Sequence, residues 1–150
     1  MNSYWIDSTE GLDKISPIDE NLEVDVCIVG AGICGLSTGY YLAKNGLKVV
    51  VIDKAGIGEK ASGNTTAKIT LGHNLIYDYL INSFGTKFAL GYFKSNKKAI
   101  SNIKEIIDKE GIECDFEKQS NYVYTKDLEE VNKIKKEVNA LNQLSSLERN

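Results

Sequence analysis

The chain has 150 residues, of which 26% are charged and 42% hydrophobic, and its formal net charge is −3. This composition is typical of about one globular domain, and the slight acidic excess argues against a nucleic-acid binder, which usually presents a basic face. No apolar run approaches the roughly 18 residues of a membrane span, and the N-terminus lacks the basic start and apolar core of a signal peptide. We therefore expect a cytoplasmic protein that binds neither nucleic acid nor a membrane.

The first half of the chain predicts one compact α/β unit. Residues 1–22 are polar apart from the cluster YWI, which we expect to be an arm that docks Trp5 against the body. Residues 24–30 (VDVCIVG) and 47–53 (LKVVVID) are apolar and rich in β-branched residues, which is typical of strands buried on both faces of a parallel sheet. Residues 33–46 (ICGLSTGYYLAKNG) predict a helix that ends at its final glycine. Together they predict a right-handed βαβ unit.

The second half of the chain has a different sequence pattern, in which a loop is followed by mainly helical periodicity. Residues 54–74 form a loop with several glycines and hydroxyl side chains, and residues 75–85 and 86–111 show helical periodicity. Residues 113–116 and 122–125 predict two short strands. A final helix is predicted from an apolar stripe that comprises Leu128, Val131, Ile134, Val138, Leu141 and Leu144.

The predicted fold is therefore α/β, with an incomplete Rossmann-like βαβ unit followed by a mainly helical α+β segment. We expect an N-terminal arm over residues 1–22, the βαβ unit and its loop over residues 23–73, and the start of a substrate domain over residues 74–150.

Few side chains suggest a disulfide, a metal site or a catalytic nucleophile. Cys27, Cys34 and Cys114 have no paired spacing, and an odd count without an export signal indicates reduced thiols. No Cys/His cluster suggests a metal site. His73 is the only histidine, so a Ser-His-Asp arrangement would have to use it, and no G-x-S-x-G motif accompanies it. We expect His73 to be a structural hydrogen-bonding residue.

A glycine motif carries the clearest chemistry. Gly30, Gly32 and Gly35 match G-x-G-x-x-G between the first predicted strand and the helix. Gly30 allows a tight turn, Gly32 lets a pyrophosphate approach the backbone, and Gly35 lets the helix pack closely. The start of the helix supplies free N–H groups for a phosphate. Asp53 ends the second strand, where a carboxylate can accept both ribose hydroxyls and repels the 2′-phosphate of NADP.

The βαβ unit alone does not distinguish FAD from NAD. Residues 61–70 (ASGNTTAKIT) follow the second strand, where a simple NAD domain would usually enter another crossover. Ser62, Thr65 and Thr66 could donate hydrogen bonds to the phosphates or flavin of a longer cofactor. Local turn and N-cap bonding is an equally good explanation for each of them.

These stretches resemble a known family. DVCIVGAGICGLSTGYYLAKNGLKVVVID followed by GEKASGNTTAKIT is similar to the N-terminal part of the FAD-dependent oxidoreductases of the D-amino-acid oxidase and glycine oxidase type. The YWI arm, TTAKIT, LIYDYL and CDFEKQSNYVYT are most similar to a bacterial branch with a C-terminal Rieske iron–sulfur domain. The resemblance implies hydride transfer to FAD from a carbon next to an amine, and hence a small amine or amino-acid substrate.

The resemblance also implies roles for particular residues. Asp53 would bind the adenosine ribose, Lys54 would lie beside the adenine, and residues 62–67 would run along the pyrophosphate towards the flavin ring. The loop holds Asn64 and no histidine that could tether flavin, so FAD would be non-covalent. The expected cofactor-binding residues are Gly30, Ala31, Gly32, Ile33, Cys34, Gly35, Asp53, Lys54, Ser62, Gly63, Thr65, Thr66 and Ala67. No catalytic residue is identifiable.

Members of that family are much longer than this chain, and their remaining sheet strands come later in the sequence. Two parallel strands cannot form a well-covered sheet, because both faces and both edges need partners. We therefore expect an incomplete oxidoreductase, whose ordered structure would need rearrangement, oligomerisation or a complementing chain. Two alternatives stay open: a stand-alone module for NAD or an adenine nucleotide, and an inactive remnant whose helices serve protein association.

Overall fold

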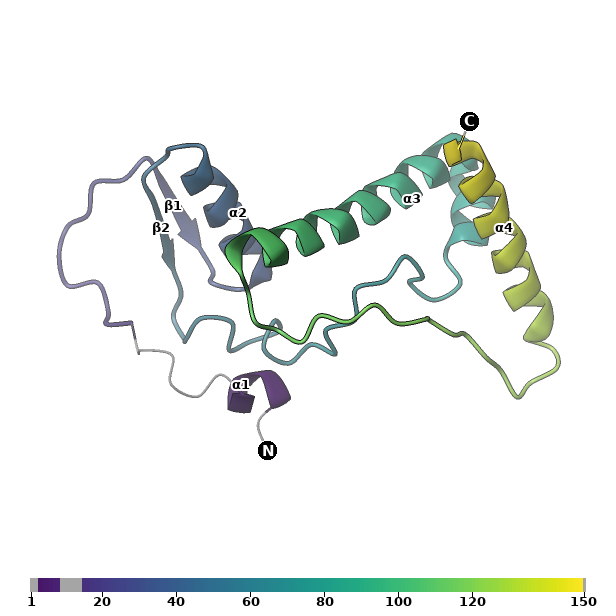
Figure 1. The fold of residues 1–150 in the computed structure, drawn as a ribbon, viewed down its shortest axis with the longest axis horizontal. Helices are drawn as coiled ribbons and strands as arrows, with labels where there is room; N and C mark the ends of the chain where they lie inside the picture. Colours follow the sequence, from purple (N-terminus) through teal and green to yellow (C-terminus); the bar gives the residue numbers. More distant parts are fainter. Residues whose placement is uncertain (1–2, 9–14, 150) are drawn as a thin grey trace. The chain divides into compact units, whose positions relative to one another are not determined.

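The computed structural model describes residues 3–8 and 15–149 (Figure 1). The chain divides into two compact units, Met1–Lys68 and Ile69–Asn150. The elements of the first unit are α1 (Tyr4–Ser8), β1 (Val26–Val29), α2 (Ile33–Lys44) and β2 (Val49–Ile52), and those of the second are α3 (Tyr77–Glu110) and α4 (Val131–Arg149).

The first unit contains a parallel pair of strands joined by a helix. Val26 of β1 lies beside Val49 of β2, and the β-branched residues of both strands favour the extended backbone. α2 lies between β1 and β2 in the sequence and ends before Asn45, and Gly46 follows it with a φ of 85°. Only glycine adopts this conformation freely, so the predicted helix stop at Gly46 is confirmed. The small parallel sheet fits part of a Rossmann-like fold.

α2 covers one face of this sheet. A Cβ atom added to Gly39 would lie 3.1 Å from Val51 Cγ2 and 3.6 Å from Ile28 Cδ1, so the helix approaches both strands closely. Successive side chains of a strand point to opposite faces, which places Cys27 and Val29 on the other face. Val29 is 82% exposed there. The prediction that both strands are buried on both faces is therefore wrong for the described residues, because that face lacks a covering layer.

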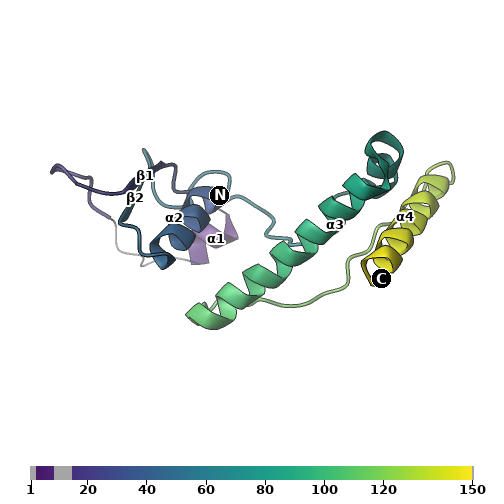
Figure 2. The ribbon, with the colours of Figure 1, turned by 90° about the horizontal axis from the view of Figure 1, so that it is seen from above.

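The second unit is built on the pairing of two helices. α3 bends at Gly85, whose φ of 83° and ψ of 161° are not helical, where the sequence predicts a break between two helical segments. α4 lies beside the first part of α3 (Figures 1 and 2). The core between them consists of Tyr77, Leu80, Ala89 and Phe93 of α3 with Ala140 and Leu144 of α4.

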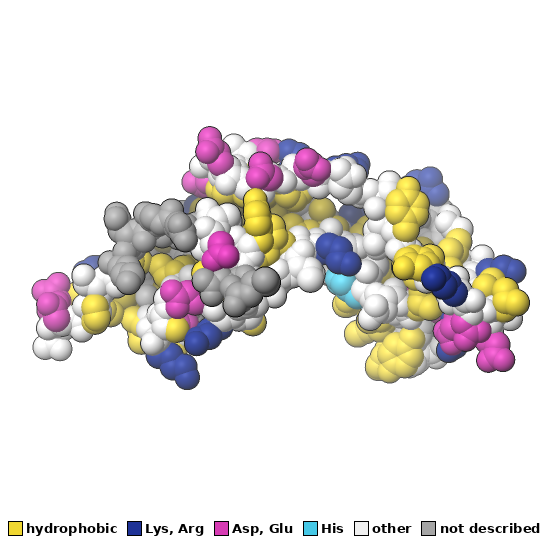
Figure 3. Space-filling model, turned by 90° about the horizontal axis from the view of Figure 1, so that it is seen from below, with side chains coloured by type: hydrophobic (Ala, Val, Ile, Leu, Met, Phe, Trp, Pro, Cys, Tyr) yellow, Lys and Arg dark blue, Asp and Glu magenta, His cyan; other side chains and the backbone are white. Residues whose placement is uncertain are grey.

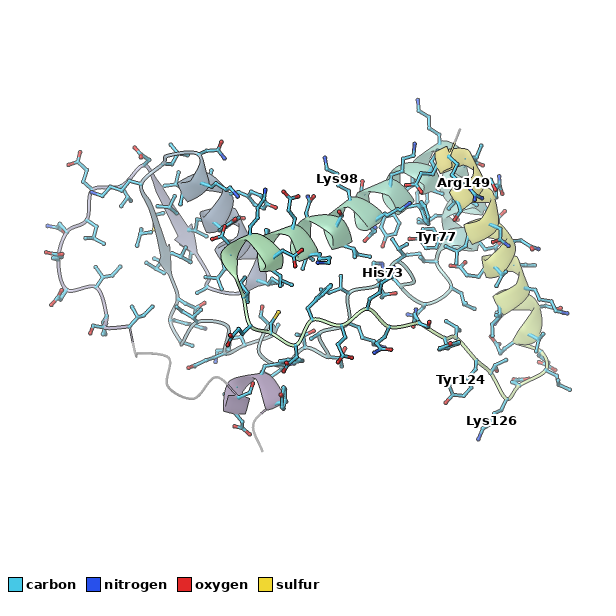
Figure 4. The ribbon with its side chains drawn as sticks, in the orientation of Figure 1. His73, Tyr77, Lys98, Tyr124, Lys126 and Arg149 are labelled. Carbon is cyan, nitrogen blue, oxygen red and sulfur yellow. The ribbon has the colours of Figure 1, made fainter. Side chains whose placement is uncertain are left out.

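The two short strands predicted in the second half are wrong. Residues 113–116 and 122–125 have extended or irregular backbone without ladder pairing in the described part of the chain. Tyr122 and Tyr124 are 82% and 83% exposed, and Tyr124 is labelled on the segment that leads to α4 in Figure 4. Alternating apolar residues form a strand only where a second backbone accepts their hydrogen bonds, and here none does.

The predicted stripe of α4 is also partly wrong. Leu128 precedes the helix and is 86% exposed, and Val138 is 49% exposed. Glu137 and Ala140 are buried in their place. The reason is that the Glu137 carboxylate accepts hydrogen bonds from the backbone N–H groups of Tyr77 and Asp78, which a valine cannot do.

The surface of the chain carries many hydrophobic side chains, which appear yellow in the space-filling view of Figure 3.

Among the described residues, none of the helices combines the length and the apolar composition that a membrane span requires. Within the same residues no group of three or more His, Cys, Asp and Glu side chains could hold a metal ion.

Candidate functional site

The glycine turn begins directly after β1. Gly30 has a φ of 112°, and its N–H group donates to the Ile52 carbonyl over 2.7 Å. This hydrogen bond joins the ends of β1 and β2, and the left-handed backbone redirects the chain towards α2. No atom lies within 4 Å of the position that a Cβ atom on Gly30 would take, so this side of the turn is open.

Gly35 brings the first turn of α2 against the backbone of the glycine turn. A Cβ atom added to Gly35 would lie 1.9 Å from the Gly30 carbonyl oxygen and 3.3 Å from Ile28 Cγ2. No side chain fits at such a distance, so the close packing that the motif predicts depends on this glycine.

The start of α2 receives its cap from the loop after β2. Gly32 is the N-cap residue and supplies no side chain, but Ser62 Oγ accepts a hydrogen bond from the Ile33 N–H group over 2.9 Å. A Cβ atom on Gly32 would lie 3.2 Å from Ser62 Oγ. The loop thus lies against the helix start, where the first N–H groups have no partner within the helix.

Asp53, which directly follows β2, forms a hydrogen bond with the glycine turn. Its Oδ2 atom accepts from the Ala31 N–H group over 2.8 Å, and its Oδ1 atom accepts from Ala55 over 2.9 Å. The hydrogen bonds from the Ala55 and Ala31 N–H groups hold the pKa of Asp53 below its ordinary value of 3.8. The carboxylate is therefore ionised near neutral pH, and it is exposed.

The structure brings most of the predicted site residues together. The turn from Gly30 to Gly35, Asp53 and Ser62 are linked by the contacts above, and Gly58 N–H donates to the Ala31 carbonyl over 2.9 Å. Gly63 follows through its own hydrogen bond to Gly58. Other predicted residues are bonded elsewhere or exposed: Thr65 Oγ1 accepts from Ala67 N–H, the Lys54 backbone N–H group donates to Asp53, and Thr66 is exposed.

The sequence did not reveal three partners of the site. Ala55 and Gly58 act through backbone groups, which leave no trace in residue type beyond the glycine-rich loop. Trp5 Nε1 donates to the Thr65 carbonyl over 2.8 Å, which confirms that the arm docks Trp5 but adds a target that the sequence did not name. The only sequence signal was the apolar cluster YWI in an otherwise polar segment.

The geometry suits a dinucleotide. The N–H groups at the start of α2 that have no partner within the helix carry partial positive charge and favour an anion such as pyrophosphate. The open side of Gly30 leaves room for a phosphate near the backbone, and the missing side chain of Gly32 lets Ser62 Oγ approach the start of α2. The Asp53 carboxylate accepts backbone N–H groups and is exposed, so it can also accept a hydrogen bond from a ribose hydroxyl. The residues present therefore fit an adenosine diphosphate moiety.

The second unit holds the only histidine. His73 Nδ1 lies 2.8 Å from the Tyr92 hydroxyl, in agreement with the structural role that we expect for it, and Figure 4 labels His73 and Tyr77. The Tyr77 hydroxyl donates to the Leu71 carbonyl over 2.7 Å. Burial, with further contributions from Tyr92 and Glu137, raises the pKa of Tyr77 to about 12. These contacts fix the start of α3.

The fold and this geometry define a class of protein, the dinucleotide-binding proteins with a βαβ unit. The glycine turn, the helix start and the ionised carboxylate all suit such a ligand. Residues 25–149 match the family described as FAD dependent oxidoreductase. The chain belongs to this family of flavin oxidoreductases, and membership implies FAD binding. The family resemblance found in the sequence is thereby confirmed.

Three relatives illustrate the match. YhfW of Bacillus subtilis, named as a Rieske 2Fe-2S iron-sulfur protein, is 39% identical over 142 residues, which are 95% of this chain and 28% of YhfW. OrdL of Haemophilus influenzae, named as an oxidoreductase, is 33% identical over 79% of this chain and 27% of OrdL. The gamma-glutamylputrescine oxidoreductase of Escherichia coli is 30% identical over 77% of this chain and 27% of that enzyme. The chain spans little more than a quarter of the length of these relatives. No solved structure matches it significantly.

Proposed function

We propose that this chain is the FAD-binding N-terminal part of an oxidoreductase that oxidises a small amine or amino acid by hydride transfer to non-covalently bound FAD. Family membership supports the flavin chemistry. The observation that carries the cofactor site is the meeting of three groups at one turn: the open glycine backbone at Gly30, the Ser62-capped start of α2, and the ionised Asp53.

Each group has a proposed role. The backbone from Gly30 to Gly35, including Ala31, Ile33 and Cys34, holds the pyrophosphate at the start of α2. Asp53 accepts hydrogen bonds from the adenosine ribose, and Lys54 lies beside the adenine. The remaining contacts along the cofactor come from Ser62, Gly63, Thr65, Thr66 and Ala67.

When bound, FAD supplies the group that accepts a hydride from the carbon next to an amine nitrogen. The residues of this chain bind and orient the adenosine diphosphate end of the cofactor. The amine class is supported by the Escherichia coli relative, whose name specifies gamma-glutamylputrescine as its substrate. Non-covalent binding is supported by the loop over residues 61–70, which contains Asn64 and no histidine.

The uncovered sheet face supports a further part of the proposal. Val29 is 82% exposed on a strand whose composition favours burial on both faces. We propose that additional polypeptide, from an oligomer or a complementing chain, packs on this face in the active enzyme.

Titration of the purified protein with FAD, NAD and ATP tests the cofactor. Saturable binding of FAD with a flavin absorption band is expected, and denaturation in acid should release all of the flavin into the supernatant. Flavin that stays with the precipitated protein would contradict non-covalent binding. Saturable NAD or ATP binding without FAD binding would favour a nucleotide module, and no binding of any of the three would favour a role in protein association.

A further inference from the structure

Residues 3–8 of the N-terminal arm are fastened to the loop that follows β2. The Trp5 indole N–H group donates to the Thr65 carbonyl over 2.8 Å, and the Ser3 hydroxyl donates to the Gly63 carbonyl. Ser3 Oγ in turn accepts from the Ile6 N–H group over 3.3 Å, so α1 holds this hydroxyl in place. Both contacts with the loop join residues that are 60 positions apart in the chain.

The arm also packs tightly on the loop backbone. A Cβ atom added to Gly63 would lie 2.5 Å from the Gly58 carbonyl oxygen and 3.2 Å from Ile6 Cγ1. Gly63 therefore allows the arm and the loop to approach each other more closely than a side chain would permit. This packing makes residues 3–8 of the arm part of the first unit.

Two neighbouring residues of the loop are held by different elements. Ser62 accepts the hydrogen bond from Ile33 at the start of α2, and Gly63 accepts from Ser3 of the arm. The loop is thus fixed on one side by the helix start and on the other by the arm. Its carbonyl groups at Gly63 and Thr65 are occupied by the arm.

We propose that the arm is a positioning element for the cofactor loop, with Trp5 and Ser3 as its positioning residues. By holding the carbonyls of Thr65 and Gly63, they keep the Ser62 hydroxyl at the start of α2, next to the place of a phosphate. The inference rests on the proposed function, because it requires the glycine turn to bind a dinucleotide. A loop that is ordered before binding loses less conformational entropy on binding, which raises affinity.

The test compares two substitutions that each keep an aromatic ring. Trp5→Phe removes the indole N–H donor, and Tyr4→Phe removes only a hydroxyl from the neighbouring residue, which is 66% exposed. The dissociation constants of FAD, ADP and adenosine are measured for the full-length protein and both variants. We expect Trp5→Phe to weaken FAD and ADP about threefold to tenfold, as the loss of one hydrogen bond does. Adenosine, which lacks phosphates, should bind unchanged, and Tyr4→Phe should bind all three ligands as the unsubstituted protein does.

Each result is decisive. Equal loss for adenosine and ADP would indicate general destabilisation and overturn the positioning role. Unchanged ADP and FAD affinity in Trp5→Phe would also overturn it while leaving the proposed function intact, whereas a failure of the unsubstituted protein to bind FAD or ADP would overturn both. Ser3→Ala provides a second variant with the same expected pattern, in case Trp5→Phe lowers the yield of folded protein.

Discussion

Two helices of this chain begin without a capping side chain of their own, and each receives one from a distant residue. At the start of α2, Gly32 is the N-cap and Ser62 accepts the Ile33 N–H group from 29 residues away. At the start of α3, Ile76 is the N-cap and Glu137 accepts the N–H groups of Tyr77 and Asp78 with its two oxygens, over 2.9 and 2.8 Å.

The two caps differ in charge and burial. Glu137 is only 4% exposed and, as a carboxylate, places a full negative charge at the positive end of α3. Ser62 is half-buried and neutral, so the positive end of α2 keeps its attraction for an anion. The comparison shows a helix start that the protein itself neutralises and another that remains suited to a phosphate.

The largest expected effect on the free energy of unfolding comes from a substitution at Gly35, at the start of α2. Gly35→Ala places a Cβ atom 1.9 Å from the Gly30 carbonyl oxygen, so the turn must move, and we expect a loss of about 3 kcal/mol in the free energy of unfolding. Urea denaturation measures this loss. The control is Gly91→Ala in α3, where no atom lies within 4 Å and where alanine should stabilise by about 0.5 to 1 kcal/mol. Equal effects of the two substitutions would contradict the close packing of α2.

Removing the charged cap should have the next largest effect. Glu137→Ala leaves two backbone N–H groups at the start of α3 without their acceptor, and we expect a loss of about 2 kcal/mol in the free energy of unfolding. The neighbouring Val138→Ala, at a residue that is 49% exposed, should change stability by less than about 0.5 kcal/mol. A smaller loss for Glu137→Ala than for Val138→Ala, again by urea denaturation, would show that the carboxylate is not the cap that stabilises α3.

Removing the neutral cap, Ser62, should lower the free energy of unfolding less than removing Glu137 does, but it should lower the affinity for FAD more. Ser62→Ala removes a single acceptor, so we expect a loss of about 1 kcal/mol in the free energy of unfolding. Its affinity for FAD should fall about threefold to tenfold, whereas folded Glu137→Ala should bind FAD as the unsubstituted protein does. Flavin fluorescence titration of both variants measures this. If both lost FAD affinity equally, the two helix starts would not differ in the way proposed.

The same comparison shows which features the sequence could predict. The helix stop and the glycine turn were predictable because they depend on residues close together in the chain. β1 and β2 were predictable because each has its partner strand within one short βαβ unit, and the position of Asp53 beside the turn was predictable from its place at the end of a strand. The caps were not, since Ser62, Glu137 and the docking of Trp5 join residues 29 to 60 positions apart. The strands predicted at residues 113–116 and 122–125 failed for the same reason: a strand exists only when a partner strand is present.

The smallest expected effect is a change in the acid dependence of stability. Because the N–H groups of Ala55 and Ala31 hold the pKa of folded Asp53 below the 3.8 of an unperturbed carboxyl, the carboxylate stabilises the fold above pH 3.8. This contribution decreases as the pH falls below 3.8 and through the folded pKa.

Asparagine in place of Asp53 has one side-chain oxygen and cannot accept both hydrogen bonds as the carboxylate does. The difference in unfolding midpoint between the unsubstituted protein and Asp53→Asn should therefore be greatest above pH 3.8 and decrease at lower pH. Asp108→Asn, which removes an exposed ion pair with Lys104, is the control and should shift the midpoint little at neutral pH. A difference for Asp53→Asn that grows as the pH falls would mean that the turn is not held by the ionised form, and the case for Asp53 as a ribose acceptor would lose its electrostatic basis.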